Sequence, residues 1–408
     1  MRILMTSYEF PPIGGGGSAV VAGLSRMLVA SGHEVDLVTM SFRGCPREEE
    51  VDGVRVHRVP CLRRAKHNCT APEALSYVAG ALPVIRRLLA KSQYDVLHAH
   101  FILPDGLLAW RVWRETRLPY VITAHGTDVP GYNQHRLRMA HRLVRPLWKR
   151  VVSGASRIIS PSEILEQLVL AQRPGPWKTL VIPNGLEVGE YAPRAHGSRI
   201  LVVTRMLERK GVQFVLDALA ESPVEPEVHI VGDGPFLPEL RRKAEALRSP
   251  AKFWGWLDNR SPQLRELYES AGIFVFPSEA ENFPIVLLEA MAAGLAIITT
   301  EGTGCAEVVG DAGLLVPVRD SKAISRALAR LIENPELRRS LGAAARQRIE
   351  DNFTWAAVAR RYVEEYGRHT VDAMPPALNL SHGTFSPARV GSAVGLLAAA
   401  QAVFPGIS

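Results

Sequence analysis

A chain of 408 residues is longer than one usual domain, so we expect two. Hydrophobic residues make up 47% of it and charged residues 22%, which is typical of a soluble globular protein with a large core. The four cysteines form no Cys-x-x-Cys pair and have no histidine at zinc spacing, which excludes a disulfide framework and indicates free thiols in a reducing compartment. Residues 1–8 lack the apolar core of a signal peptide, so we expect a cytoplasmic protein.

The basic charge is concentrated in the first half of the chain. Residues 1–180 carry 24 Lys and Arg against 14 Asp and Glu, a net +10, whereas the remainder carries 24 against 27, a net −3. The segment 136–157 holds no acid, and its basic and apolar side chains interleave at helical spacing. It fits either a core-packed helix with a solvated outer face or a helix that adsorbs to an anionic membrane surface. No aromatic platform or binding module accompanies it, so we expect no nucleic-acid partner.

Short apolar runs alternate with helical patterns along the first half. The expected strands are residues 2–8, 34–40, 54–60, 94–100, 120–124, 157–160 and 179–183, with helices such as 19–30 and 105–116 between them. Such alternation predicts a parallel sheet covered by helices on both faces. The charged residues 43–52 are expected to form an exposed loop.

The pattern stops at residues 187–198, which we interpret as a linker, and then restarts. Further strands are expected at residues 200–204, 227–231, 252–254, 273–276, 296–299 and 314–316, followed by helices from about residues 322, 336 and 354. We therefore predict a first doubly wound domain (1–186), a second (199–353), a helix that crosses back to the first (354–369) and a disordered tail (370–408). The apolar end of the tail is too interrupted to predict a membrane-spanning helix.

A glycine-rich turn, residues 11–18, follows the first expected strand. Gly15 and Gly16 precede a helix, where backbone N–H groups favour an anion. The turn departs from the Gly-x-Gly-x-x-Gly pattern, and no acid ends the second strand to hold a ribose. The turn is thus either an anion site or simply a tight turn, and a nicotinamide cofactor is disfavoured.

His125 follows another strand of the same expected sheet, at the edge where ligands of open α/β sheets bind. It is interpreted either as a substrate contact or as a structural histidine. His98 and His100 share a strand end, but no third ligand stands at a suitable spacing, so we expect no metal site.

Two cations follow the first strand of the second domain. Arg205 can bind phosphate oxygens with two N–H groups, and Lys210 supplies a point charge, so together they suit a diphosphate. The chain has no Asp-x-Asp motif to place a divalent ion on that diphosphate. The alternative is solvated surface charge.

Residues 277–294 are predicted to form the loop and helix that leave a buried strand. Pro284 fits the first helical turn, and the N–H groups of Ile285 and Val286 then form an anion site at the helix start. An ordinary amphipathic helix is the alternative.

Two acids flank that helix start. Glu281 precedes it, and Glu289 lies roughly 7 Å further along at 1.5 Å of rise per residue. This separation matches the span between a phosphate and its ribose.

These motifs together resemble the retaining glycosyltransferases of family 4, which have the two-domain GT-B fold. The resemblance covers about residues 1–367 and depends on seven motifs in one order. They are Gly15-Gly16, His125-Gly126, Pro183-Asn184-Gly185, Arg205 with Lys210-Gly211, Gly232-Asp-Gly-Pro235, Gly255-Trp256, and Glu281 with Glu289 at the family's spacing. It implies an α/β protein in which two Rossmann-like domains face a cleft.

The resemblance also implies a hexosyltransferase that keeps the anomeric configuration and needs neither a metal nor another cofactor. According to this resemblance, Arg205 and Lys210 stabilise the departing diphosphate of a nucleotide-sugar. Catalysis would then be electrostatic stabilisation of the negative charge that develops on this leaving group. Glu281 would hold the donor sugar and Glu289 the ribose. The remaining assignments are His125 beside the reacting sugar, Gly15 and Gly16 at the phosphates, and Asn184, Phe283, Pro284, Ile285 and Val286 in substrate binding.

Asn282 and Pro284 stand where family members often carry glycines, so we expect the loop around Phe283 to bind its sugar differently. Our hypothesis is a peripheral enzyme of the inner membrane face that moves sugar from a UDP-sugar to a lipid-linked or cell-surface glycan acceptor. A GDP-mannose-dependent mannosyltransferase and a sugar-nucleotide epimerase of the same fold are the alternatives. A non-catalytic nucleotide-sugar sensor is a further one.

Overall fold

The computed structural model describes residues 1–66, 68–132, 138–172, 175, 177–193, 197–221, 226–248, 251–259 and 261–370, and the side chains of 138–140 and 370 are not described. The chain forms two compact units. Of the described residues, the first contains those within Met1–Pro161, Leu165–Ile182 and 359–370, and the second contains those within Ser162–Ile164 and Pro183–Val358. The expected disorder of residues 371–408 lies outside the described residues.

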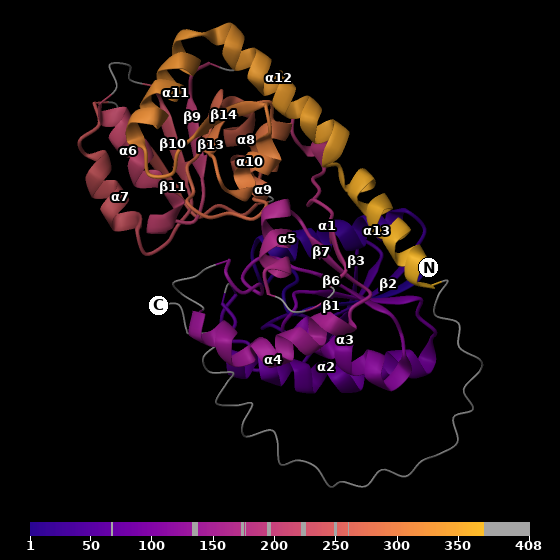
Figure 1. Ribbon diagram of the computed structural model, residues 1–408. Coiled ribbons are helices and arrows are strands. Elements are labelled where there is room, and N and C mark those ends of the chain that lie inside the picture. The colour runs from indigo at the N-terminus through magenta and orange to yellow at the C-terminus, as the bar shows by residue number, and fades with distance from the viewer. Residues whose placement is uncertain are drawn as a thin grey trace, which may run out of the picture. The chain divides into compact units, whose positions relative to one another are not determined.

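The first unit is built on an eight-stranded sheet of order β3-β4-β2-β1-β5-β6-β7-β8 (Figure 1). Its strands are β1 (Arg2–Ser7), β2 (Glu34–Met40), β3 (Glu48–Val51), β4 (Val54–Val59), β5 (Val96–His100), β6 (Tyr120–Thr123), β7 (Arg157–Ser160) and β8 (Thr179–Val181). Every pairing is parallel except β3 with β4. The central strands β1, β2 and β5 are buried on both faces, as expected of a parallel sheet covered by helices.

The expected loop at residues 43–52 is wrong in part, because Glu48–Val51 forms the edge strand β3. Three consecutive glutamates carry no apolar alternation, so the strand state depends on pairing with β4. Arg58 of β4 donates from Nε to Oε1 of Glu49 at 2.6 Å, which fixes the pairing with an ion pair. A strand selected by its neighbour leaves no local apolar signal.

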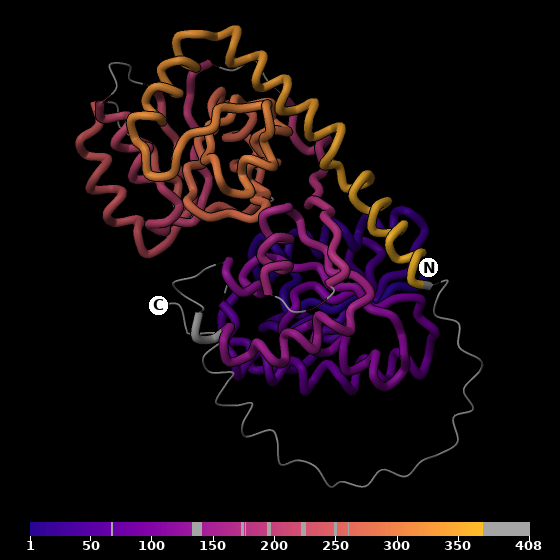
Figure 2. Tube along the Cα trace, viewed as in Figure 1, coloured from indigo at the N-terminus to yellow at the C-terminus, as the bar shows by residue number. Residues whose placement is uncertain are grey.

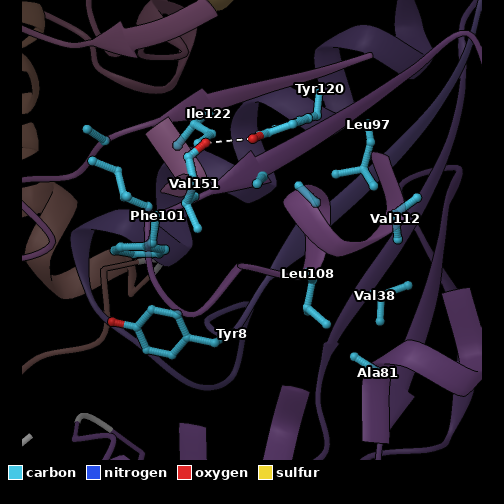
Figure 3. Close-up of a cluster of buried hydrophobic side chains, with 14 of the residues drawn as sticks. Tyr8, Val38, Ala81, Leu97, Phe101, Leu108, Val112, Tyr120, Ile122 and Val151 are labelled. Atoms are coloured by element: carbon cyan, nitrogen blue, oxygen red, sulfur yellow. Dashed lines mark hydrogen bonds between the residues drawn. The ribbon is translucent and has the colours of Figure 1, made fainter. Parts of the chain in front are cut away.

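Helices cover both faces of the first sheet. They are α1 (Gly16–Ala30), α2 (Ala71–Lys91), α3 (Asp105–Thr116), α4 (Arg138–Gly154), α5 (Glu163–Leu170) and the later part of α13 (Trp355–Thr370). Figure 1 shows α2, α3 and α4 side by side along one face. Their side chains close the core drawn in Figure 3, where the hydroxyl of Tyr120 donates to the carbonyl of Val151 at 2.6 Å.

The second unit has a six-stranded parallel sheet of order β11-β10-β9-β12-β13-β14. Its strands are β9 (Ile200–Val203), β10 (Val228–Val231), β11 (Ala251–Gly255), β12 (Ile273–Phe276), β13 (Ala296–Thr300) and β14 (Gly313–Val316). One face is covered by α8 (Pro262–Ser270), α9 (Ile285–Ala292), α10 (Gly304–Val309) and α12 (Pro335–Asn352), and the other by α6 (Val212–Ala220), α7 (Leu237–Ala244) and α11 (Ser321–Glu333). Two short 3-10 helices, η1 (Val188–Glu190) and η2 (Glu208–Lys210), precede β9 and α6.

The two Rossmann-like sheets and the returning C-terminal helix confirm the predicted fold class. The chain runs from α12 into α13, and from Ala359 onward α13 belongs to the first unit, a path that Figure 2 traces. Tyr362 and Tyr366 anchor it there through hydrogen bonds to Thr123 at 3.0 Å and His98 at 2.7 Å.

Two helical glycines allow a matched test of packing. A Cβ on Gly342 of α12 would overlap the carbonyl oxygen of Gly294, whereas a Cβ on Gly367 of α13 would meet nothing within 4 Å. We expect Gly342→Ala to lower the free energy of unfolding by about 1–3 kcal/mol through overpacking. Gly367→Ala should raise it by up to about 1 kcal/mol, since alanine is the better helix former. Urea unfolding followed by circular dichroism measures both, and equal effects would contradict the packing.

Candidate active site

Two loops meet at the carboxyl edge of the second sheet, where the neighbouring strands β9 and β12 end. Gly211 has a positive φ of 74°, and a Cβ there would overlap the carbonyl oxygen of Pro277. The N–H of Glu279 donates to the carbonyl of Arg209 at 2.9 Å. This close approach, which only glycine permits, brings the η2 segment against the loop that follows β12.

The approach pairs two of the predicted site residues. Nζ of Lys210 forms an ion pair with Oε1 of Glu281, and each side chain is only 11% exposed. Ser278 donates from its hydroxyl to the same carboxylate at 2.7 Å, and Nζ of Lys210 lies 5.5 Å from the ring centroid of Phe276. A largely buried pair is costly to break, because removal of one partner leaves the other charge uncompensated. Both charges are therefore held in place before any ligand binds.

The loop around Phe283 is held by side chains from distant parts of the second unit. Nδ2 of Asn184 donates to the carbonyl of Phe283 at 3.2 Å, and the Phe283 ring packs edge-on against Phe353 at 5.4 Å between centroids. The hydroxyl of Ser162 donates to Oδ1 of Asn282 at 2.5 Å. Asn282 is buried, and this hydrogen bond anchors the loop.

Pro284 is the N-cap of α9, with φ −73° and ψ 121°, which corrects its expected place in the first helical turn. The extended backbone of a residue that starts a helix suits proline equally well, so the spacing alone did not separate the two positions. Ile285 and Val286 form the first turn of α9, and their N–H groups have no acceptor among the described residues. The helix start therefore has the donors that an anion requires.

Glu289 of α9 is buried and hydrogen-bonded. The hydroxyl of Tyr268 in α8 donates to its Oε2 at 2.8 Å. Burial raises the pKa of the Glu289 carboxyl to about 7, against the lowering effect of hydrogen bonds from Tyr268 and Tyr191. The predicted ribose contact of Glu289 stays a prediction.

Arg205 follows β9 and is exposed, unlike Lys210. Its carbonyl accepts from the N–H of Leu207 at 2.8 Å, which turns the chain toward η2. The structure thus places the two predicted cations on one loop but in different environments.

In the first unit, Gly15 is the N-cap of α1 and Gly16 is its first residue. Both are exposed, and a Cβ on either would meet nothing within 4 Å. The N–H of Gly15 lies 3.4 Å from Oε2 of Glu9. The neighbouring Gly14 and Gly17 are the glycines that packing requires, because a Cβ would overlap Ser18 and Glu9 at Gly14 and the Phe101 ring at Gly17.

His125 lies beside this helix start. Its ring stacks on Phe101 at 4.2 Å between centroids, and its Nε2 is 3.2 Å from Nδ1 of His100. Oδ1 of Asp128 accepts from the N–H groups of His125 and Gly126 at 3.0 and 2.9 Å. Both the ring and the backbone of His125 are therefore fixed.

The sequence analysis did not assign several residues to a supporting role. Ser278 and Asp128 lie three residues from Glu281 and His125, which they orient. Their short separation in the sequence could therefore have predicted these contacts. Tyr268 and His100 act across 21 and 25 residues, and nothing in the linear pattern joins them to Glu289 or His125.

The chain is similar to known proteins in sequence and in fold. The family description "Glycosyltransferase Family 4" matches residues 14–190, and "Glycosyl transferases group 1" matches residues 197–334. The chain is 29% identical to a glycogen synthase of Mycobacterium tuberculosis over 90% of this chain and 94% of that protein. It is 26% identical to an uncharacterized glycosyltransferase of Methanocaldococcus jannaschii, over 90% and 98% respectively.

Solved structures share the fold. Sucrose-phosphate synthase from Thermosynechococcus elongatus has a TM-score of 0.76 at 23% identity, with 91% of this chain and 100% of that chain covered. HepE from Anabaena in complex with UDP-glucose has a TM-score of 0.71 at 17% identity, with 90% and 100% covered.

The two Rossmann-like units, together with the two family matches and the shared fold, identify the protein as a GT-B glycosyltransferase. The chain belongs to glycosyltransferase family 4.

The buried carboxyl of Glu289 predicts a pH-dependent stability. The folded protein keeps a proton up to a pH of about 7, whereas the unfolded chain releases it near 4.5. Stability should thus fall as the pH rises through this window, by up to about 3 kcal/mol for the full shift. We expect Glu289→Gln, which keeps an acceptor for Tyr268, to match the parent protein at pH 4.5 and to exceed it at pH 8. Urea unfolding across this pH range measures the difference.

The matched control is Glu364→Gln on the exposed side of α13. Its difference from the parent should stay flat with pH. A flat difference for Glu289→Gln as well would contradict the raised pKa.

Proposed function

We propose that this glycosyltransferase transfers a sugar, with retention and without a metal, from a nucleotide-sugar to a glycan acceptor. The observation that carries the proposal is the ion pair of Lys210 and Glu281 at the carboxyl edge of the second sheet. Ligands of doubly wound sheets bind at that edge, at the point where the strand order reverses. Strands β9 and β12 flank that reversal.

Sugar transfer requires stabilisation of the negative charge that develops on the departing diphosphate. Lys210 supplies a positive charge, and Arg205 a second one from the same loop. The free N–H groups at the start of α9 supply further donors. These groups support stabilisation of the leaving group by the chain itself, with no resident cofactor.

Glu281 takes the donor-sugar hydroxyls in this proposal, and Glu289 takes the ribose. A carboxylate fixed by Lys210 and Ser278 retains acceptor capacity on its second oxygen. In the first unit, the family resemblance assigns His125 to the reacting sugar and Gly15 and Gly16 to the phosphates. The exposed backbone at Gly15 and Gly16 suits close approach by a ligand.

We propose a UDP-sugar as the donor, because HepE, which shares the fold, holds UDP-glucose. The acceptor in this proposal is a lipid-linked or cell-surface glycan precursor. A GDP-mannose-dependent mannosyltransferase and an epimerase of the same fold are the competing functions. A thermal-shift comparison of UDP, GDP and ADP separates the bases, since a bound ligand stabilises the folded state. Conversion of the donor with no acceptor present would identify an epimerase.

We also propose that α4 adsorbs to an anionic lipid surface from the cytoplasmic side. Its inner side is buried through Trp148, Val151 and Val152, and its outer side exposes basic residues together with Leu143, which is 49% exposed. Cationic side chains around an exposed apolar one suit a lipid headgroup layer. Arg136 and Leu137 of the predicted basic segment lie outside the described residues, and no described helix is long and apolar enough to span a membrane.

The ion pair gives a test of catalysis. We expect Lys210→Ala to lower sugar transfer by about 100- to 1000-fold, because one stabilising group at the leaving diphosphate is lost. Transfer is measured as donor-dependent product formation over a panel of nucleotide sugars and glycan acceptors. Absence of both binding and turnover with every nucleotide sugar would overturn the proposed function.

The control is the exchanged pair, Lys210→Glu with Glu281→Lys. It retains an ion pair between the two loops, so its thermal stability should stay closer to that of the parent than does that of Lys210→Ala. Its transfer should be abolished, since an acid then stands where the diphosphate requires a cation. Transfer at the parent rate would show that the pair serves only the fold.

Membrane adsorption has its own test. We expect the triple reversal of Arg142, Arg145 and Arg150 to glutamate to reduce binding to phosphatidylserine vesicles, measured by flotation. The loss should amount to at least about 3 kcal/mol, or about 100-fold, because three attractive charges are lost and three repulsive ones are added. The matched control reverses Lys322, Arg326 and Arg330, an exposed basic row on α11. Equal losses of vesicle binding from both triple variants would show that the binding depends only on net charge, and would overturn the proposed role of α4.

A further inference from the structure

The ring nitrogens of His125 face different surroundings. Nε2 lies 3.2 Å from Nδ1 of His100, a hydrogen bond in which either nitrogen can be the donor. Nδ1 lies on the side of Gly17, where a Cβ added to that glycine would stand 3.5 Å away. No other described residue takes Nδ1 in a hydrogen bond, and the residue is only partly buried. Nδ1 is thus the nitrogen that remains for a ligand.

His100 decides which way the shared hydrogen bond runs. It is fully buried, and its Nε2 has no hydrogen-bond partner among the described side chains and backbone groups. A buried N–H without an acceptor is among the rarest groups in folded proteins, whereas an unused lone pair is better tolerated. The single proton of neutral His100 therefore belongs on Nδ1. Burial lowers the pKa of both His100 and His125, to about 3 for His125, which keeps both rings neutral.

A proton on Nδ1 of His100 is donated to Nε2 of His125, so His125 carries its own proton on Nδ1. We propose that His100 is a positioning residue that holds His125 as an Nδ1–H donor directed to the start of α1. In that form His125 donates a hydrogen bond to an oxygen of the ligand and cannot accept a proton at Nδ1. A free imidazole in water prefers the opposite tautomer, with the proton on Nε2.

The ring of His100 is supported from behind. The His98 ring packs against it at 4.1 Å between centroids, with the two planes tilted by 35°, because residues two apart on a strand share a face. His98 is bonded at Nδ1 to the hydroxyl of Tyr366 at 2.7 Å and at Nε2 to the hydroxyl of Thr123 at 2.8 Å. The helix α13 therefore holds the histidine stack against rotation.

The test is the tautomer itself, observed in the full-length protein labelled with ¹⁵N-histidine. Long-range ¹⁵N–¹H correlation spectra should show His125 with a protonated Nδ1 and a bare Nε2. The Nε2–H form of His125 in the parent protein would overturn the proposal without any variant. This readout needs no turnover, so it separates this inference from the proposed function, on which only the contact between His125 and the sugar depends.

Two substitutions then assign the effect to His100. His100→Phe keeps the ring volume but removes the donor, and should shift His125 toward the Nε2–H form and lower kcat/KM by about 10- to 100-fold through misplacement of the donor group. His100→Asn restores an N–H near the position of Nδ1 and should recover both the spectrum and most of the activity. Tyr366→Phe tests support of the stack and should leave the tautomer unchanged. An unchanged His125 spectrum in His100→Phe would contradict the assignment.

Discussion

The site of the second unit depends on one backbone contact, that of Gly211 with the carbonyl of Pro277. A side chain at Gly211 would separate the two loops, and the ion pair of Lys210 with Glu281 depends on their approach. The contact is possible because β9 and β12 are adjacent in the sheet although they are far apart in the chain. The strand order brings the two loops near each other, and Gly211 lets them come close enough for Lys210 and Glu281 to form an ion pair.

In the first unit, loops after two adjacent strands also come into close contact, but uncharged rings lie at the contact. Strands β1 and β5 adjoin at the reversal of its strand order, and the turn after β1 meets Phe101 after β5 through Gly17. There a row of packed neutral rings, rather than an ion pair, fixes His125, which we propose as the ligand contact. The two units thus contribute different chemistry, a compensated charge in one and a directed neutral donor in the other.

Most of the fold was predictable because strands buried on both faces of a parallel sheet are mostly apolar, as the runs at β9 and β12 are. The edge strand β3 was not predictable, because its residues are mostly charged and its strand conformation depends on pairing with β4. The positions of Lys210 and Glu281 followed from motif spacing, although their direct pairing did not. That pairing depends on the φ of Gly211, which the sequence permits but does not require.

The acidic strand β3 has a consequence for how the molecule meets copies of itself. An open sheet edge presents unpaired N–H and C=O groups that can recruit a strand from another chain. Glu48 and Glu49 form ion pairs with Arg87 and Arg58, and Glu50 is exposed, so a strand added at this edge would have to displace water from charged groups. At the opposite edge, Arg361 of α13 occupies the carbonyl of Val181 in β8. Charged side chains at one border and a side-chain hydrogen bond at the other thus both disfavour the addition of a further strand.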